Sequence, residues 1–145
     1  MALHLVKLCV GVDSVAQLRR WQARHLRDGA ALEHRTRNMP RRRDEILAGG
    51  SLYWIVKGFV CVRQPIVGLE SRLGEDGRRC CAIRLDPALI ATLPRRHRPF
   101  QGWRYLDAAE APADLDDAAV AAATPGMSEA PPAAMLAELR SLGLL

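Results

Sequence analysis

Long apolar runs are missing from this 145-residue sequence. The first stretch, MALHLVKLCVGV, is interrupted by His4 and Lys7 and is followed by Asp13, so it falls short of the roughly 18 apolar residues that a membrane span needs. The same stretch lacks the basic start and the small-residue cleavage site of a signal peptide. We therefore expect a soluble, cytoplasmic protein without membrane contact.

Motifs for metal binding and for common catalytic chemistry are also missing. The four cysteines show no CxxC spacing and lie in apolar segments, and the four histidines show neither HxH nor HxxxH spacing. No serine lies in a nucleophile elbow, and the segment GLESRLGEDG has no P-loop lysine. We therefore expect buried, reduced cysteines, no metal site and no cofactor.

Charge is abundant but unevenly distributed. Residues 1–106 contain 20 basic and 9 acidic residues, a net charge of +11, whereas residues 107–145 contain 1 basic and 7 acidic residues, a net charge of −6. We therefore divide the chain into a basic folded domain, residues 1–106, and an acidic Ala/Pro-rich linker with a short C-terminal helix, residues 107–145. A strongly cationic domain of this size favours an anionic partner.

The acidic segment has few bulky apolar residues, which predicts a largely disordered tail. Its final stretch places apolar side chains on one face of a short helix, which can fold back on the domain or bind a protein partner. These side chains are Met135, Leu136, Leu139 and Leu142. Because an acidic tail is tethered to a cationic body, we also expect weak autoinhibition of polyanion binding.

Hydrophobic periodicity in the first part of the chain predicts a strand, a helix and a second strand. The helix is expected over residues 14–27, with Ser14 as its N-cap and Gln17 three residues later in a capping box. A short strand then has to stop before Pro40. A short helix follows, opened by residues 41–43.

The middle of the chain predicts a hairpin. The run GGSLYWIVKGFVCVRQPI indicates two antiparallel strands, residues 52–56 and 59–63, joined by a tight Lys57-Gly58 turn. Pro65 is expected to bend the second strand or to place it at a sheet edge, before the apolar run resumes. Another strand is expected over residues 78–85. Together these elements predict an α+β domain with a mostly antiparallel, barrel-like sheet.

Arginines stand beside aromatic residues in several segments. The arginines at 41–43 open a helix, where cations oppose the macrodipole, so we expect them to serve a ligand. The block from Pro94 to Leu106 combines a cationic loop with three rings, and guanidinium groups pair with phosphates while rings stack on bases. In the alternative interpretation, the rings fill the core and the arginines are merely solvated. The candidate nucleic-acid-binding residues are Arg37, Arg41, Arg42, Arg43, Trp54, Arg63, Arg95, Arg96, Arg98 and Trp103.

Several strings of the sequence resemble an uncharacterised bacterial family, one of the numbered domains of unknown function. The strings are LHLVKLCVG, TRNMPRR, GGSLYWIVKGFVCVRQPI, the LDP after the arginine-rich strand, and RRHRPFQGWRYL. The resemblance covers residues 1 to about 115 and leaves the tail outside. It supplies a family but implies no activity.

The order of elements also resembles small PUA-like barrels, including the ASCH and EVE relatives. This resemblance implies a mostly antiparallel barrel with one or two flanking helices. It also implies a basic and aromatic cleft that binds RNA or a modified base. On this basis Arg37, Trp54, Arg63 and Trp103 would line the cleft.

The leading functional hypothesis is nucleic-acid binding, to RNA or to an extruded base, through a continuous open basic groove. Two alternatives stay open. An enzyme acting on an anionic small molecule would use His34 or His97 as a general base beside Asp86 in a closed pocket. A protein-interaction adaptor would dock an acidic protein on an apolar patch rimmed by charge.

Overall fold

The computed structural model describes residues 3–9, 14–27, 32–98 and 100–114 of the chain. Strands and helices alternate at first, and strands alone follow. The elements are β1 (Leu3–Leu8), α1 (Val15–Arg27), β2 (Glu33–Thr36), α2 (Arg43–Leu47), β3 (Ser51–Val56), β4 (Phe59–Leu73), β5 (Arg79–Leu85), β6 (Ile90–Arg96) and β7 (Trp103–Asp107). The domain is therefore α+β. The disordered tail and the C-terminal helix expected beyond residue 114 lie outside the described residues.

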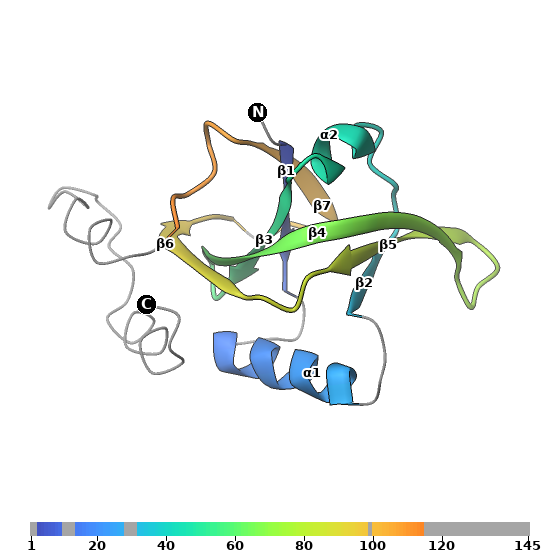
Figure 1. Ribbon diagram of the computed structural model, residues 1–145, viewed down its shortest axis with the longest axis horizontal. Helices are drawn as coiled ribbons and strands as arrows, with labels where there is room; N and C mark the ends of the chain where they lie inside the picture. The colour runs from blue at the N-terminus through green and yellow to red at the C-terminus, as the bar shows by residue number, and fades with distance from the viewer. Residues whose placement is uncertain (1–2, 10–13, 28–31, 99, 115–145) are drawn as a thin grey trace, which may run out of the picture.

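The strands form an open mixed sheet in the order β2-β5-β4-β3-β1-β7, and β6 pairs with β4 beside this path (Figure 1). The β1–β3 pair is parallel, and the other described pairs are antiparallel. The 15-residue strand β4 lies at the centre: its first part pairs with β3 and β6, and its second part pairs with β5. Within the described residues β2 and β7 do not pair, so strand pairing leaves the sheet open between them.

The predicted hairpin between β3 and β4 is confirmed. Lys57 and Gly58 have φ values of 53° and 81°, and a two-residue type I′ turn requires positive φ at both positions. The second strand is longer than expected and continues through Pro65. Proline lacks an N–H, but β4 changes partners here, since its pairing with β3 ends at Pro65 and its pairing with β5 begins at Ile66.

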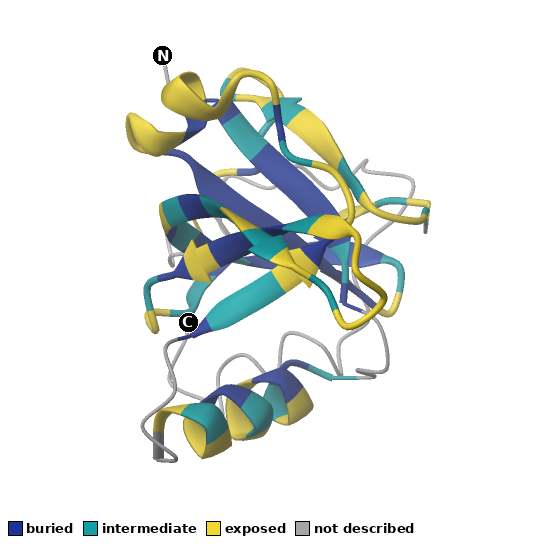
Figure 2. Ribbon diagram, turned by 90° about the vertical axis from the view of Figure 1, so that its right-hand side faces the viewer, coloured by how far each residue is buried: buried dark blue, intermediate teal, exposed yellow. Residues whose placement is uncertain are grey.

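Helix α1 begins where the capping box predicts. The Ser14 side-chain oxygen accepts a hydrogen bond from the Gln17 N–H at 3.2 Å, which satisfies one free donor of the first turn. Val15 and Leu18 are buried in the main core. Figure 2 shows the buried face of α1 turned toward the sheet and its exposed face turned away.

Helix α2 lies at the other end of the sheet from α1 (Figure 1). Ile46 is its buried residue, and the chain then turns sharply at Gly50 to enter β3. A Cβ atom at Gly50 would lie 2.2 Å from the Leu3 carbonyl oxygen and 2.6 Å from the Ile46 carbonyl oxygen. Glycine is therefore required where α2 meets β1.

The core has two parts on opposite faces of the sheet, because side chains alternate along each strand. The main core contains Trp54 of β3 together with the buried residues of α1. The smaller part, which we call the second cluster, consists of Val6, Tyr53, Ile55 and Val60. Phe100, Leu106 and Ala111 pack against the second cluster.

Strand β6 was not predicted. Arg95 and Arg96, which the sequence placed in a cationic loop, are its last two residues and pair with Val60 and Phe59 of β4. Residues 108–114 then follow the edge of β6, where the Leu93 N–H donates to the Ala113 carbonyl at 2.8 Å. Strand β7 ends at Asp107, and contacts with β6 and with Val6, Tyr53, Ile55 and Val60 continue through residues 111–114.

Candidate nucleic-acid interface

Strand β7 touches the segment that joins β2 to α2, residues 37–42, which we call the link. The Trp103 indole N–H donates a hydrogen bond to the Asn38 carbonyl at 2.7 Å. The Tyr105 hydroxyl accepts a hydrogen bond from the Arg42 backbone N–H at 3.2 Å. These two bonds bridge the sheet between its outer strands and fix both rings to the backbone of the link.

The rings of Trp103 and Tyr105 form what we call the aromatic platform. Their centroids lie 4.9 Å apart with an interplanar angle of 70°, an edge-to-face contact. Trp103 is half-buried against the main core, and Tyr105 is 37% exposed. The Arg42 guanidinium lies 5.6 Å from the Tyr105 ring centroid. The platform is therefore held rigidly while part of its aromatic surface faces solvent.

Four arginines of the link and of α2 lie on the chain segment that holds the platform, but they are not equivalent. The Arg42 guanidinium binds the Glu45 carboxylate through two nitrogens, and Arg43 donates to the Leu69 carbonyl at 2.9 Å. Arg37 and Arg41 are exposed, and within the described chain neither forms a hydrogen bond or an ion pair. Two cations beside the platform are therefore available to an anion.

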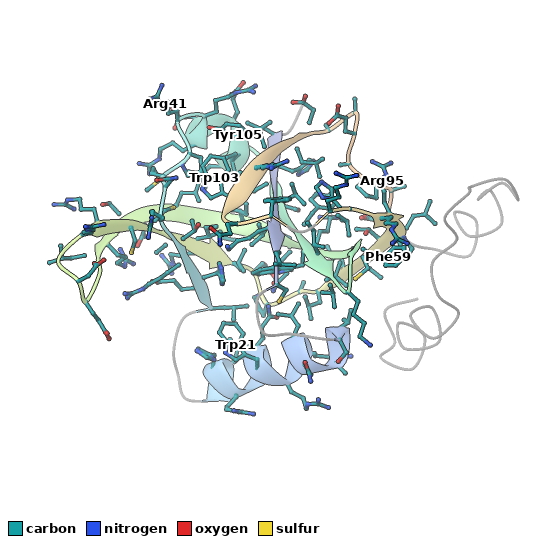
Figure 3. The ribbon with its side chains drawn as sticks, turned by 180° about the vertical axis from the view of Figure 1, so that it is seen from behind. Trp21, Arg41, Phe59, Arg95, Trp103 and Tyr105 are labelled. Carbon is teal, nitrogen blue, oxygen red and sulfur yellow. The ribbon has the colours of Figure 1, made fainter. Side chains whose placement is uncertain are left out.

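The structure separates the remaining predicted residues from this group. Figure 3 shows Trp103, Tyr105 and Arg41 on one side of the molecule and Arg95 on the other. Arg96 and Arg98 are exposed at and beyond the end of β6. Of the ten predicted site residues, Arg42 and Trp103 therefore lie at the platform, and Arg37, Arg41 and Arg43 belong to the chain segment beside it. Tyr105 joins them as a residue that the sequence did not select.

Trp54 offers no stacking surface in this structure. Its exposed fraction is 1%, and its indole N–H donates to the Gln64 side-chain oxygen at 2.8 Å. Gln64 in turn exchanges two hydrogen bonds with the Gln22 amide of α1, at 2.7 and 3.0 Å. Trp54 therefore belongs to a buried polar network that ties β3, β4 and α1 together.

Arg63 lies apart from the platform and is already bound to an anion. Its Nε and one terminal nitrogen contact the two Asp114 carboxylate oxygens at 2.7 and 2.8 Å. Arg95 donates to the backbone carbonyl of Glu110. One acidic side chain beyond residue 106, that of Asp114, therefore forms an ion pair with a basic residue of the domain.

A buried lysine was not among the predicted site residues. Lys7 is 7% exposed, pairs in register with Trp54 and Trp103, and within the described residues has no hydrogen bond or ion pair at its ammonium group. Burial lowers the pKa of Lys7. The sequence did contain a signal, since Lys7 alternates with Leu3 and Leu5 on the inward face of β1.

His34 and Cys9 share this interior environment. The His34 ring lies 5.0 Å from Trp54 in an edge-to-face contact. Burial, followed by the charge of Lys7, lowers the pKa of His34 to about 4, and burial raises the pKa of the Cys9 thiol to about 12. At neutral pH the imidazole is therefore uncharged and the thiol keeps its proton.

The arrangement expected of an enzyme is not assembled in the described part of the chain. The Asp86 carboxylate, expected beside a histidine, accepts a hydrogen bond from the Ala88 N–H at 2.9 Å. A cavity of about 290 Å³ lies between α1 and the β5–β6 connection, and no histidine or carboxylate lines it. Its lining residues are Arg19, Gln22, Ala23, Leu26, Pro87, Ala88 and Leu89. The described residues also contain no group of three His, Cys, Asp or Glu side chains that could hold a metal ion.

Comparisons with known proteins supply a family. None of the helices in the described residues is long and apolar enough to span a membrane. Searches of curated proteins and of solved structures found no match. A family model matches residues 5–145, which includes the tail that the sequence resemblance had left outside. The chain belongs to the family described as "Protein of unknown function (DUF1489)".

Proposed function

We propose that this domain binds single-stranded RNA, or a base extruded from RNA, across the aromatic platform. The observation that carries the proposal is the attachment of Trp103 and Tyr105 to the link backbone while their rings stay partly accessible. Rings that are already fixed lose little conformational freedom when a base stacks on them. Each such stack contributes roughly 1–3 kcal/mol.

Arg37 and Arg41 are the proposed phosphate contacts. Both are exposed and unpaired within the described residues, and they lie on the segment that holds the platform rings. Each phosphate contact releases condensed counterions, which makes binding depend on salt. The net charge of +11 over residues 1–106 supplies a long-range attraction for the same ligand.

We also propose that the sheet is a PUA-like barrel that closes through side chains. The hydrogen bond from Trp103 to Asn38 supports this, because it joins β7 to the chain directly after β2, where strand pairing is interrupted. The RNA-binding proposal places the ligand over this junction. A cytoplasmic location, as expected from the sequence, is part of the same proposal.

The test is binding of a short, fluorescently labelled single-stranded RNA, measured by anisotropy over a series of salt concentrations. Tyr105→Ala removes a platform ring, and we expect affinity to fall about tenfold, within the roughly 1–3 kcal/mol of one stack. Tyr105→Phe keeps the ring but loses the hydroxyl that accepts the Arg42 N–H, so we expect it to bind more tightly than Tyr105→Ala and more weakly than the parent protein.

The arginines are tested against a control of equal charge. Arg37→Ala with Arg41→Ala should weaken binding and reduce its salt dependence. Arg20→Ala with Arg24→Ala removes the same charge from the exposed face of α1, at the other end of the sheet, and should have a much smaller effect. Equal losses in both double variants, or full binding by Tyr105→Ala, would place the ligand away from the platform.

A further inference from the structure

Residues 108–114, which we call the strap, cross from β7 to the edge of β6. Ala111 packs on the second cluster, and the Ala113 carbonyl accepts a hydrogen bond from the Leu93 N–H at 2.8 Å. Asp114 forms an antiparallel bridge with Thr92. The strap therefore has an anchored middle, at Ala111, and it ends with a carboxylate beside β4.

Arg63 receives that carboxylate in a bidentate arrangement. Its Nε lies 2.7 Å from Asp114 Oδ1, and its Nη2 lies 2.8 Å from Asp114 Oδ2. Two parallel N–H groups recognise a carboxylate or a phosphate in this way. The third nitrogen, Nη1, donates to Ser51 Oγ at 2.9 Å, and Ser51 is 1% exposed. A buried hydroxyl therefore fixes the guanidinium independently of Asp114.

Other hydrogen-bond donors lie around Arg63. Its register partner is Tyr53, and the His4 ring lies 5.0 Å from the Tyr53 ring. The His4 Nδ1 accepts the Ser51 backbone N–H at 2.9 Å, so the neutral ring carries its hydrogen on Nε2. Burial, followed by the charge of Arg63, lowers the pKa of His4, which keeps the ring neutral.

The Arg63–Asp114 ion pair is partly exposed to solvent. The Arg63 side chain is 22% exposed and the Asp114 side chain is 52% exposed. Ala111, and not Asp114, packs on the second cluster, so the Asp114 side chain can leave Arg63 without breaking that contact. Among the described residues, Asp114 is the carboxylate that pairs with Arg63, so its release leaves a fixed cation and neighbouring donors without a counterion.

We propose that Arg63 and Ser51, flanked by Tyr53 and His4, form an oxyanion-binding site for the phosphate or carboxylate group of a ligand. In the structure the Asp114 carboxylate occupies this site. The ligand's oxyanion replaces that carboxylate on Nε and Nη2 of Arg63. Only molecules in which Asp114 has left Arg63 can bind the ligand. An Arg63–Asp114 pair that is formed for about nine-tenths of the time therefore weakens ligand binding about tenfold. The site lies away from the aromatic platform and does not depend on RNA binding.

The test uses inorganic phosphate and acetate as separate probes, titrated against ¹⁵N-labelled protein and followed by NMR at the Arg63 Nε–H and at the Ser51 amide. Asp114→Asn should bind phosphate, acetate or both about tenfold more tightly than the parent. The probe with the larger gain identifies the preferred oxyanion. Glu110→Gln removes the same charge from the strap without touching Arg63, and it should bind like the parent.

Further variants distinguish an oxyanion-binding site at Arg63 from an ion pair that only stabilises the fold. Adding Arg63→Gln to Asp114→Asn should abolish the gain, whereas adding Arg37→Ala and Arg41→Ala should leave it intact. The bound probe should also raise the Tm of Asp114→Asn. The proposal is overturned if Asp114→Asn binds no better than Glu110→Gln, if the gain survives Arg63→Gln, or if neither probe changes the Tm.

Discussion

Replacing Gln64 by methionine should destabilise the domain strongly, because the amide is fully buried and makes four hydrogen bonds. Its oxygen accepts from the Trp54 indole and from the Gln22 amide at 2.8 and 2.7 Å. Its nitrogen donates to the Gln22 oxygen and to the Asp86 carbonyl at 3.0 and 3.1 Å. Methionine keeps the length of the side chain but satisfies none of these partners.

The size of the effect follows from the groups left behind. The Trp54 N–H, the Gln22 amide and the Asp86 carbonyl each lose a partner, and an unsatisfied buried polar group costs about 1–3 kcal/mol. Because the Gln22 side chain lines a cavity and can turn toward solvent, we expect a total loss of about 3–6 kcal/mol. A loss of that size lowers the Tm by about 10–20 °C.

The assay is urea denaturation monitored by tryptophan fluorescence, to which Trp54 contributes together with Trp21 and Trp103. Gln22→Leu is the matched control, because it leaves Gln64 bonded to Trp54 and to Asp86 and should cost only about 1–2 kcal/mol. If Gln64→Met costs less than about 1 kcal/mol, or no more than Gln22→Leu, the amide network does not carry the stability assigned to it.

Three further predictions concern pH, backbone contact and salt. His34 has a pKa of about 4 in the folded protein and 6.5 in the unfolded chain, so the unfolded chain binds more protons between these pH values. The free energy of unfolding should therefore fall by up to about 3 kcal/mol as the pH drops from 6.5 to 4. Urea denaturation at several pH values should show this fall, and His34→Gln should remove it. Gly50→Ala should cost about 2–4 kcal/mol in the same assay, because the new Cβ meets the Leu3 carbonyl, and an unchanged midpoint would contradict that contact. Arg37→Ala with Arg41→Ala should reduce the slope of log affinity against log salt by about 1.4 for single-stranded RNA, and an unchanged slope would exclude both arginines as phosphate contacts.

Local sequence signals predicted the elements that depend on local chemistry. Ser14 and Gln17 set the start of α1, and the Lys57-Gly58 turn set the β3–β4 hairpin, because these contacts lie within a few residues. Strand β6 was missed because its stability comes from pairing with β4, about 30 residues earlier in the chain, and because Pro94 and the arginines after it are typical of a loop.

Prediction of the candidate site succeeded where the sequence places arginines and rings on elements that meet in space, as with Arg41 and Trp103. It could not separate the accessible ring from the buried one, since Trp54 and Trp103 both stand near other aromatic residues and arginines in the sequence. Nor could it foresee that Asp114 would bind Arg63, because nothing local links two residues 51 positions apart.

The position of β1 between β3 and β7 also bears on how the chain folds. Leu5 pairs with Leu52 on one side and with Tyr105 on the other, about 100 residues later. Closing such long loops carries an entropy cost before any contact repays it, which places folding on the millisecond-to-second scale of sheets with non-local pairing. During synthesis, β1 keeps one edge without its partner until β7 has left the ribosome. The apolar first strand is therefore the segment most exposed to mispairing between nascent chains.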